Sequence, residues 1–533
     1  MGKGTKPKPN GGAGSGSAKK PAPANSGGSS SLASAETLRL LWMGSAVAIA
    51  VAIAVPFTLR TLAAAPPTAS TMPSSSNAAA EMAREPPRSP ARCIDGWAEC
   101  PRVPGADWVA LAELEAAVKM AEFDAASIEA CLGPTPLLSP EPVQGMHLLC
   151  VLPPPRWRRE NEDEVRGGEE AGVAAMLAIF PMMERRERPS RVVMLPSLSK
   201  ADDIITVLRY KLRFPSRGPK YQRPALFTED GVRLVKAEAA LGRGNRALHR
   251  LLCLEGGQWL WPPVEKGHVH IIHNLTAPGV DTRVVTVSLK PLVVEVENFL
   301  SAEESKYIIE RASPHMEKSG VALKDADIGK AAKEFRTSSQ YFLPTTRDPM
   351  LEKIDRRVQY LTRIPISHAE YIQVLRYNHM EHYSAHHDFF DPAAYASSPD
   401  MLASVEHGAR NRLATVFFYL NNVTNDPDVT KGGGQTNFPR AATSEFPQGG
   451  PQPYDYFDCS KGLSVYPQEG KVIIFYSMLP NGQMDDFSLH GGCDVLDPSA
   501  TKWSANFWLW NKPYQFNDAA RKTSTAMLQQ QYL

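Results

Sequence analysis

The sequence has almost no net charge, although 22% of its residues are charged. The 533 residues include 58 lysines and arginines and 57 aspartates and glutamates, which gives a formal net charge of +1. Proteins that bind nucleic acid usually carry a basic patch or a strongly basic domain that faces the phosphates. The composition therefore does not indicate a nucleic-acid-binding protein.

Large apolar side chains are scarce in residues 1–37, which are rich in Gly, Ser, Ala, Pro and Lys. A segment of this kind cannot bury enough apolar surface to fold. The sequence therefore predicts a disordered basic tail here, and a second polar tail at 516–533. The last residues, MLQQQYL, contain no retrieval signal, and they leave the compartment open.

One long uncharged run, residues 40–59, reads LLWMGSAVAIAVAIAVPFTL. As a helix that rises about 1.5 Å per residue, it is about 30 Å long, which matches the hydrocarbon thickness of a bilayer. A transmembrane helix is predicted; a cleaved signal peptide and a buried helix are the alternatives, although a signal peptide is usually shorter and nearer the start. Basic residues before the run favour a cytosolic N-terminus and a single-pass type II protein in the endoplasmic reticulum or Golgi membrane. These residues are Lys3, Lys6, Lys8, Lys19, Lys20 and Arg39.

The seven cysteines all follow this run, in what would be an oxidising lumen. Their odd number leaves at least one thiol unpaired or intermolecular, and their connectivity cannot be deduced from the sequence. Two N-glycosylation sequons, which begin at Asn274 and Asn422, would be usable in the same compartment. The cysteines are Cys93, Cys100, Cys131, Cys150, Cys253, Cys459 and Cys493.

Three segments connect the predicted membrane helix to the last domain. Residues 61–106 are rich in Pro, Ser and Ala and are typical of a stalk. Residues 107–190 are expected to be a helical and linker region, whose amphipathic helix stops at Gly133. Residues 191–262 faintly resemble a β-grasp module with a hairpin at Thr228–Gly231. No cluster of acids, bases or nucleophiles occurs in that module, so an interaction role is expected.

The main chemical signal lies in residues 377–390, which read YNHMEHYSAHHDFF. If this run is a strand, His386 and Asp388 project to the same face while His387 points away. His490, in SLHGGCDV, follows the buried-strand pattern VIIFY and is the best candidate for a third ligand. Two imidazoles and one carboxylate are the ligand set of non-haem Fe(II) oxygenases. A histidine-rich surface loop is the alternative.

Five motifs from about residue 291 to 510 resemble the prolyl 4-hydroxylase family of Fe(II)/2-oxoglutarate dioxygenases. In chain order they are PLVVEVENFLSAEE, FRTSS, AEYIQVLRYNHMEHYSAHHDFF, RNRLATVFFYLNNV with GGGQTNFP, and SLHGGCDV with KW. The resemblance implies a mainly β catalytic domain at 285–515, a double-stranded β-helix (jelly roll) with flanking helices. The transmembrane helix and a smaller α+β region would precede this domain. Ser301 and Glu304 form a capping box that opens its first helix.

The resemblance also implies the cofactors and the residues that hold them. Fe(II) would bind to His386, Asp388 and His490, with L-ascorbate as a further cofactor. Lys502 would pair with the distal carboxylate of 2-oxoglutarate, and Thr436 and Tyr377 would donate hydrogen bonds. Lys502 follows His490 by twelve residues, about two more than is usual in the family. A loop insertion before Lys502 explains the difference; a shifted strand would put cosubstrate binding in doubt.

Substrate contacts follow from the same motifs. Five residues match family positions along the peptide groove, where a proline-rich segment of a secretory protein would lie in polyproline II form. Glu370 and Arg412 could equally form a structural ion pair, and Trp510 stands where many relatives carry His or Arg. A catalytically silent peptide-binding membrane protein and a hydroxylase of another side chain, such as lysine, remain alternatives, and a partner subunit is unknown. The groove residues are Arg336, Ser338 and Glu370 as substrate-binding residues, and Tyr383 and Arg412 as catalytic residues.

Overall fold

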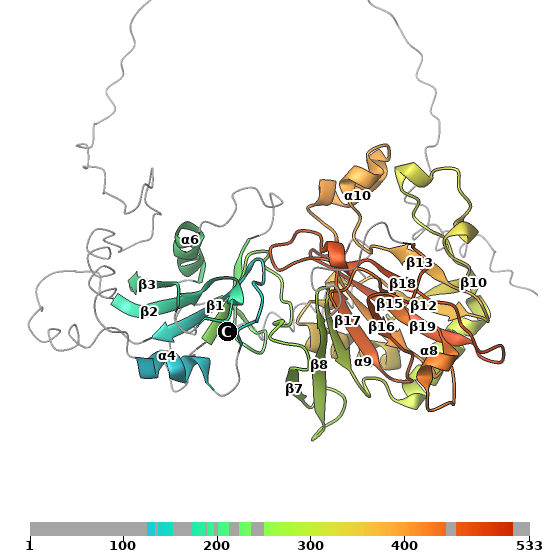
Figure 1. Ribbon diagram of the computed structural model, residues 1–533, viewed down its shortest axis with the longest axis horizontal. Helices are drawn as coiled ribbons and strands as arrows, with labels where there is room; N and C mark the ends of the chain where they lie inside the picture. The colour runs from blue at the N-terminus through green and yellow to red at the C-terminus, as the bar shows by residue number, and fades with distance from the viewer. Residues whose placement is uncertain are drawn as a thin grey trace, which may run out of the picture. The chain divides into compact units, whose positions relative to one another are not determined.

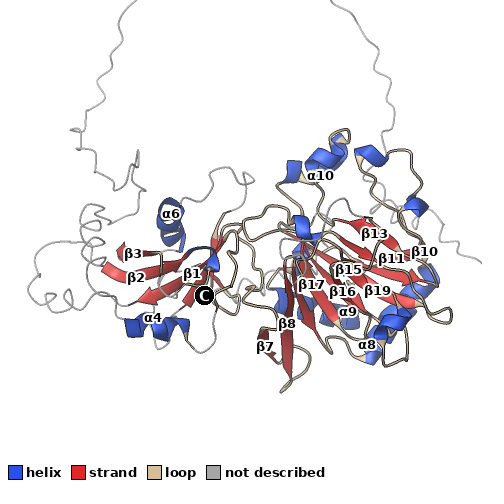
Figure 2. Cartoon of the chain, viewed as in Figure 1, coloured by secondary structure: helices blue, strands red, loops and turns tan. Residues whose placement is uncertain are grey.

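The structure is a computed structural model, and the secondary structure along it is mostly strand (Figure 2). The predicted tail, membrane helix and stalk, and most of the predicted helix before Gly133, lie outside the residues that it describes. It describes residues 125–133, 137–152, 173–186, 189–196, 201–212, 223–235, 250–443 and 455–514.

The first sheet has six strands in the order β3-β2-β1-β6-β4-β5, and every neighbouring pair is antiparallel. Two helices, α4 (Ala125–Leu132) and α6 (Ala201–Lys211), accompany it. The strands are β1 (Met146–Leu152), β2 (Val173–Phe180), β3 (Arg191–Pro196), β4 (Ala225–Phe227), β5 (Arg233–Leu234) and β6 (Arg250–Leu254). This is a small α+β region, as the sequence predicted.

The prediction that residues 107–190 form only helix and linker is wrong, because β1 and β2 both lie there. Their sequences, MHLLCVL and VAAMLAIF, are nearly continuous apolar runs. A strand that is buried on both faces does not alternate in polarity, so its pattern cannot be distinguished from that of a buried helix. The β-grasp interpretation of 191–262 stays a prediction, and the sheet that those residues form also includes β1 and β2.

The catalytic region is built on a nine-stranded sheet in the order β10-β11-β12-β19-β14-β17-β9-β8-β7 (Figure 1). All of its neighbouring pairs are antiparallel. The strands are β7 (Val269–His273), β8 (Asp281–Leu289), β9 (Leu292–Val296), β10 (Glu317–Lys318), β11 (Ser339–Leu343), β12 (Ile372–Tyr377), β14 (Arg412–Tyr419), β17 (Val472–Tyr476) and β19 (Lys502–Trp510).

A smaller four-stranded sheet, in the order β13-β18-β15-β16, faces the large one. Its strands are β13 (Tyr383–His386), β15 (Thr436–Phe438), β16 (Leu463–Val465) and β18 (His490–Gly492). Phe438 and Val465 from the small sheet share an apolar cluster with Phe417, Tyr419 and Phe475 from the large sheet. The two sheets therefore enclose a common interior, and the prediction of a mainly β catalytic region is confirmed.

Helices cover the other face of the large sheet. Ile308 on α8 (Ala302–Ala312) and Ile354 on α9 (Pro349–Thr362) share a core with Val416 and Phe418 of β14. Since alternate residues of β14 face opposite sides, Thr415, Phe417 and Tyr419 point into the space between the sheets. The predicted capping box at Ser301 and Glu304 is present at the start of α8. A short helix, α10 (Pro399–Ser404), lies in the connection to β14.

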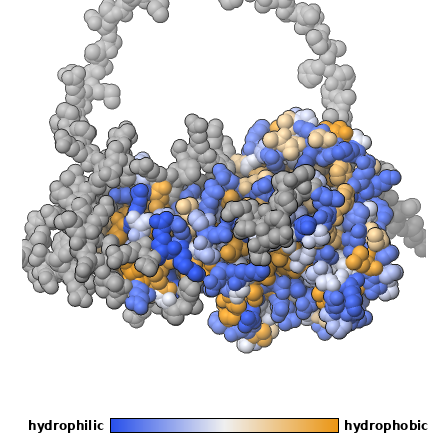
Figure 3. Space-filling view, in the orientation of Figure 1, coloured by the Kyte–Doolittle hydropathy of each residue, from blue (hydrophilic) through white to orange (hydrophobic). Residues whose placement is uncertain are grey.

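The visible surface of the described part is mainly hydrophilic, with hydrophobic residues in small separate patches (Figure 3). This is the pattern of a folded unit whose large apolar side chains are in its core. Within the parts of the chain that the structure describes, no helix combines the length and apolar character needed to cross a bilayer.

Candidate functional site

The two sheets bring together the three predicted metal ligands. His386 ends β13 and His490 begins β18, and the two residues are partners in the antiparallel pairing of these strands. Asp388 follows β13, and its carboxylate oxygens lie 3.8 Å from His386 Nε2 and 3.6 Å from His490 Nε2. One potential ligand atom from each residue lies within 4.8 Å of the other two. This is the one such cluster of His, Cys, Asp or Glu among the described residues.

Backbone carbonyl groups orient both imidazole rings. The Nδ1 atoms of His386 and His490 each lie 2.9 Å from a carbonyl oxygen, of Ser384 and Ser488 respectively. Because a carbonyl oxygen only accepts, Nδ1 carries the proton and Nε2 keeps a free lone pair. Burial, and then the neighbouring His490, lower the pKa of His386 well below its usual value. The ring is therefore neutral at physiological pH, as a metal ligand must be.

The third ligand, Asp388, is held as a carboxylate. Burial alone would raise its pKa, but His490, Arg412 and His386 outweigh burial and lower the pKa to about 2. The Thr415 hydroxyl also donates a hydrogen bond to Asp388 Oδ2 over 2.6 Å. Two imidazole nitrogens and one anionic oxygen that are not hydrogen-bonded to one another fit Fe(II), with positions left for other ligands.

His387 lies apart from this cluster, as the strand pattern predicted. Its Nε2 lies 3.2 Å from the carbonyl oxygen of Asp486 and donates to it. Aromatic rings pack against His490 instead: the ring centroids of Phe475 and Phe438 lie 4.4 and 5.8 Å from its own. Aromatic side chains from both sheets therefore pack against this ligand.

Lys502 is fully buried in the interior between the two sheets, with only 1% of its surface exposed, and its Nζ lies 5.5 Å from the centre of the Phe417 ring. It begins β19 opposite Tyr377 at the end of β12, and its Nζ lies 5.0 Å from the centre of the Tyr377 ring. None of the described residues forms a hydrogen bond or an ion pair with Lys502, and burial lowers its pKa to about 7. An ammonium in such a place requires an anion. The distal carboxylate of 2-oxoglutarate fits this need.

The two extra residues before Lys502 are accommodated in a loop. Asp497 accepts a hydrogen bond from the amide of Ser499 over 2.9 Å in a turn, and the pairing of β19 with β12 starts at Lys502. The strand therefore begins with Lys502 facing inward, near Tyr377. Thr436 and Tyr377, the other two predicted cosubstrate residues, are buried in the same interior.

Two residues of this interior were not assigned a role from the sequence, Thr415 and Tyr419. Thr415 donates to Asp388, and the hydroxyl oxygen of Tyr419 lies 2.8 Å from Thr436 Oγ1. The Tyr419 ring centre is 5.9 Å from Lys502 Nζ. Both residues belong to the RNRLATVFFYLNNV motif, and the alternation of Thr415, Phe417 and Tyr419 is the signal that could have identified them.

Among the predicted substrate residues, Glu370 and Arg412 form an ion pair. Arg412 donates to both carboxylate oxygens of Glu370, over 2.7 and 3.1 Å, and Trp510 Nε1 donates to the same group over 2.8 Å. Arg412 Nη1 also lies 3.8 Å from Asp388 Oδ1. Glu370 and Arg412 are therefore ion-paired, and the pair lies beside the Asp388 carboxylate. Their predicted roles at the peptide groove stay predictions.

Arg336, Ser338 and Tyr383 form a second group, which lies beside the ligand His386. The ring of Tyr383 stacks on His386 with 3.7 Å between ring centroids, and the guanidinium of Arg336 lies 4.5 Å from the same ring centre. Arg336 Nε donates to Ser338 Oγ over 2.9 Å, while its buried Nη2 has no hydrogen-bond partner among the described residues. Burial raises the pKa of Tyr383 to about 12, so its hydroxyl stays protonated.

Comparison with known proteins places these residues in one family. Residues 372–510 match the family model of the 2OG-Fe(II) oxygenase superfamily. The protein named "Probable prolyl 4-hydroxylase 10" of Arabidopsis thaliana is 39% identical over 228 residues, which cover 42% of this chain and 70% of the relative. "Prolyl 4-hydroxylase 1" of the same plant is 35% identical over 229 residues, which cover 42% of this chain and 71% of the relative.

A solved structure of a viral collagen prolyl hydroxylase from Paramecium Bursaria Chlorella virus-1 also matches. It is 22% identical, with a TM-score of 0.28, and the match covers 41% of this chain and 95% of the viral protein. The plant relatives are matched over more than two thirds of their length and at more than a third identity. On that sequence evidence, the chain belongs to the prolyl 4-hydroxylase family of the 2OG-Fe(II) oxygenase superfamily.

Proposed function

We propose that this protein is a membrane-anchored prolyl 4-hydroxylase whose catalytic domain faces the lumen of the endoplasmic reticulum or Golgi. Its substrates are proline-rich segments of secretory proteins. One atom of O2 enters the C4–H bond of a peptidyl proline as a hydroxyl group. The other atom enters succinate, which forms from 2-oxoglutarate with release of CO2. L-Ascorbate would keep the iron reduced.

The observation that carries the proposal is the placement of Lys502 in the interior that also contains the ligand cluster. A buried ammonium without a protein partner is costly, and this one lies in the same interior as His386, Asp388 and His490. When bound, Fe(II) supplies the redox chemistry that activates O2. Lys502 binds and orients the cosubstrate, and the surrounding aromatic rings exclude water from the reacting atoms.

Arg336 and Tyr383 are suited to position the peptide. The unpartnered Nη2 of Arg336 can donate to a backbone carbonyl of the substrate, and the Tyr383 hydroxyl remains a donor at neutral pH. A proline-rich segment in polyproline II form has its backbone carbonyls free and its shape already set, which lowers the cost of ordering it. Arg412, held by Glu370, keeps its charge beside Asp388 and contributes to catalysis through that carboxylate.

Two disulfides support a lumenal catalytic domain. Cys131 is bonded to Cys150, and Cys459 is bonded to Cys493, while Cys253 is a buried free thiol. Disulfides persist mainly in secretory compartments and outside the cell. Asn274 and Asn422, the first residues of the two sequons, are both exposed. The predicted membrane helix at 40–59 lies outside the described residues, and the anchor rests on its sequence alone.

The activity is tested on the full chain, purified in detergent, with Fe(II), 2-oxoglutarate, ascorbate and a proline-rich peptide. We expect peptide-dependent succinate release and a product heavier by one oxygen on proline, and both should vanish in Asp388→Ala. Oxygen on a lysine of a mixed peptide would favour the other side-chain specificity. Peptide binding without turnover, unchanged in Asp388→Ala, would favour the silent binding protein.

The topology is tested separately in microsomes. We expect the catalytic domain to resist added protease until the membrane is opened, and to carry glycans that Asn274→Gln and Asn422→Gln remove. Cleavage of the domain in intact microsomes would refute the lumenal orientation without affecting the hydroxylase proposal.

A further inference from the structure

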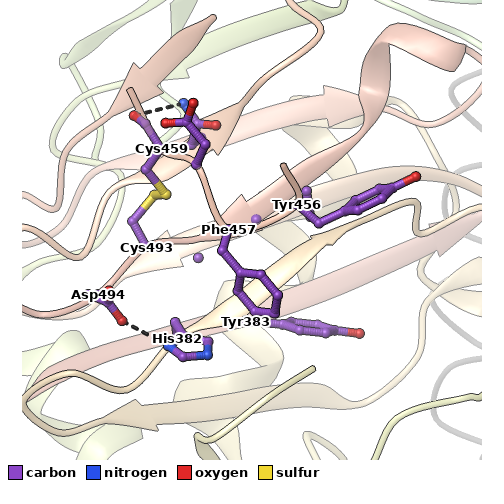
Figure 4. Close-up of a pocket in the computed structure, with 12 residues that line it drawn as sticks. His382, Tyr383, Tyr456, Phe457, Cys459, Cys493 and Asp494 are labelled. Atoms are coloured by element: carbon purple, nitrogen blue, oxygen red, sulfur yellow. Dashed lines mark hydrogen bonds and ion pairs between the residues drawn. A yellow bond between two sulfur atoms is a disulfide. The ribbon is translucent and has the colours of Figure 1, made fainter. Parts of the chain in front are cut away.

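A cavity of about 310 Å³ is lined by residues of β13 and β18 and by the segment that contains Tyr456 and Phe457 (Figure 4), and none of the three metal ligands lines it. In β18, His490 faces the interior between the sheets, while Gly491, Gly492 and the following Cys493 line the cavity. Ala385 of β13 lines it in the same way, next to the ligand His386. A volume near 300 Å³ is at the low end for ligand sites and suits one side chain better than a large molecule.

The segment 455–459 covers this cavity and is fixed to the small sheet. The amide of Ala385 donates to the carbonyl of Tyr456 over 2.8 Å, and the disulfide joins Cys459 to Cys493. Even so, Tyr456 and Phe457 are 51% and 53% exposed. Two neighbouring exposed aromatic side chains at the rim of a cavity are typical of a binding site.

The cavity has acidic groups and no permanent cation. Asp494 and Asp458 line it, and none of the described lining residues is lysine or arginine. Among the described residues, Asp494 is paired with His382 alone, over 2.8 Å. The His382 ring meets Phe457 edge to face at 5.4 Å between centroids. Figure 4 shows the Phe457 ring between Tyr383 and the His382–Asp494 pair. Hydrogen bonds from Ser460 lower the pKa of Asp458, so it stays anionic.

We propose that this cavity is a subsite for a lysine or arginine side chain of the polypeptide substrate, close to the proline that is hydroxylated. The proposal rests on the function proposed above. The aliphatic stem of such a side chain packs on Phe457, and its cationic head lies beside that ring and Asp494. An anionic side chain would be repelled by the two carboxylates, and an apolar one would desolvate them without compensation.

Tyr383 places the subsite within reach of the reaction. Its ring stacks on the ligand His386 and lies 4.5 Å from the Arg336 guanidinium, and Tyr383 is also one of the residues that line the cavity. The cavity therefore begins one side chain away from the metal centre. A polyproline II chain advances about 3.1 Å per residue, so a basic residue a few positions from the proline can enter the cavity while the proline is at the ligands.

The test uses the full chain and pairs of proline-rich peptides that differ only by lysine or glutamine at one position. Each of about four positions on either side of the target proline is compared. At one of them we expect KM to be about fivefold lower for the lysine peptide, with kcat unchanged, because a cation–π contact and a carboxylate act on binding alone. The difference should shrink as salt is raised.

Two variants and a matched control assign the effect to the cavity. Asp494→Asn and Phe457→Leu should each bring the ratio of the two KM values close to one. Glu310→Gln, on the exposed surface of α8, changes net charge by the same amount as Asp494→Asn. It should leave the ratio of the two KM values at the wild-type value. Equal KM values for both peptides at every position, or a ratio that survives Asp494→Asn, would overturn the subsite.

Failure of the subsite and failure of the proposed function give different results. If no peptide is turned over, the hydroxylase proposal fails, and fluorescence anisotropy of labelled lysine and glutamine peptides then tests the subsite by binding. Tighter binding of the lysine peptide that is lost in Asp494→Asn supports the subsite. Equal binding of the two peptides refutes it.

Discussion

The two sheet systems of this chain differ in what they bury. Among the described residues of the six-stranded region, 125–254, no lysine, arginine, aspartate or glutamate is buried. An apolar cluster in this region, called here the second apolar cluster to distinguish it from the core that the helices share with β14, contains Leu149, Leu177, Leu251 and the free thiol of Cys253. The catalytic region buries charges at or beside the ends of β12, β13 and β19, namely Glu370, Asp388 and Lys502. One region is stabilised by packing and a disulfide, while the other contains charges that its own residues do not fully neutralise.

This difference locates the chemistry. A buried charge is tolerated when a partner or a ligand of opposite charge compensates it. A buried charge without a protein partner therefore indicates a binding site for a ligand of opposite charge. Glu370 and Arg412 compensate each other, whereas Lys502 has no partner in the described chain. The contrast predicts that loss of a buried charge in the catalytic region will reduce activity without reducing stability. Loss of a buried apolar side chain in the six-stranded region should reduce stability without reducing activity.

The largest expected effect is that of Lys502→Met. Loss of the cation should weaken binding of 2-oxoglutarate by about 100-fold or more, because the distal carboxylate would then be buried unpaired. The free protein should melt at a higher temperature than the wild type, since a desolvated ammonium is replaced by an apolar side chain of similar length. Calorimetric titration of the cosubstrate and thermal melting of the free protein measure the two effects.

Lys502→Arg is the matched control, because it keeps the positive charge. It should retain more cosubstrate affinity than Lys502→Met and should gain no stability. Lys502→Met could instead lower the melting temperature and leave the affinity for 2-oxoglutarate unchanged. Lys502 would then be a structural residue, and the proposed difference between the two regions would be wrong.

Leu149→Ala tests the other region. Leu149 is fully buried in β1, within the second apolar cluster. Its truncation leaves a cavity and should lower the free energy of unfolding of this region by about 2–5 kcal/mol. Denaturant unfolding followed by a probe in this region measures the loss, and kcat at low temperature should stay at the wild-type value. A large fall in kcat would show that the six-stranded region takes part in catalysis.

Much of the catalytic site could be predicted from the sequence because its residues occur in short ordered motifs. The side-chain period of two in a strand placed His386 with Asp388, and the distal motif supplied His490. The same period would put Tyr383 and His386 on opposite faces, since they are three residues apart. The pairing of β13 with β18 is irregular between them, and this irregularity allows Tyr383 to stack on His386.

Other features depended on tertiary contacts that no local pattern specifies. The continuous apolar runs of β1 and β2 gave no period to distinguish strand from helix. The ion pair of Glu370 with Arg412 joins residues on different elements, and its hydrogen bond from Trp510 comes from the end of β19. Sequence alone therefore left the ion pair open, and the assembled sheet shows it. The predicted substrate role of Glu370 stays a prediction.

Thr415→Val should have a smaller effect that remains confined to the catalytic region. The substitution keeps the shape of the side chain and removes the hydroxyl that donates to Asp388. Loss of an outer partner of a metal ligand typically costs about 10- to 100-fold in metal affinity. Competition for Fe(II) with a calibrated chelator under anaerobic conditions measures it. Unchanged affinity would mean that Arg412 alone suffices to hold the carboxylate.

The smallest expected effect is a pH dependence that comes from Lys502. It should appear in cosubstrate binding and in the stability of the catalytic region, and not in the stability of the six-stranded region. Burial lowers the pKa of Lys502 from 10.5 to about 7. In the free enzyme Lys502 is therefore mostly neutral above pH 7, while the unfolded chain keeps that lysine protonated up to its ordinary pKa. Between these two values the folded state binds fewer protons, so the stability of the free catalytic region should rise with pH.

Cosubstrate binding should follow the opposite trend in the same window. The distal carboxylate favours the ammonium and raises the pKa of Lys502 in the complex, so binding above pH 7 takes up a proton. The affinity should fall by at most about tenfold per pH unit as pH rises above 7, and Lys502 should add no such slope below that value. Calorimetric titrations of 2-oxoglutarate in two buffers of different ionisation enthalpy measure the number of protons taken up on binding. Lys502→Arg, which is charged throughout, should lose this uptake; uptake that persists in the variant would assign the titration to another group.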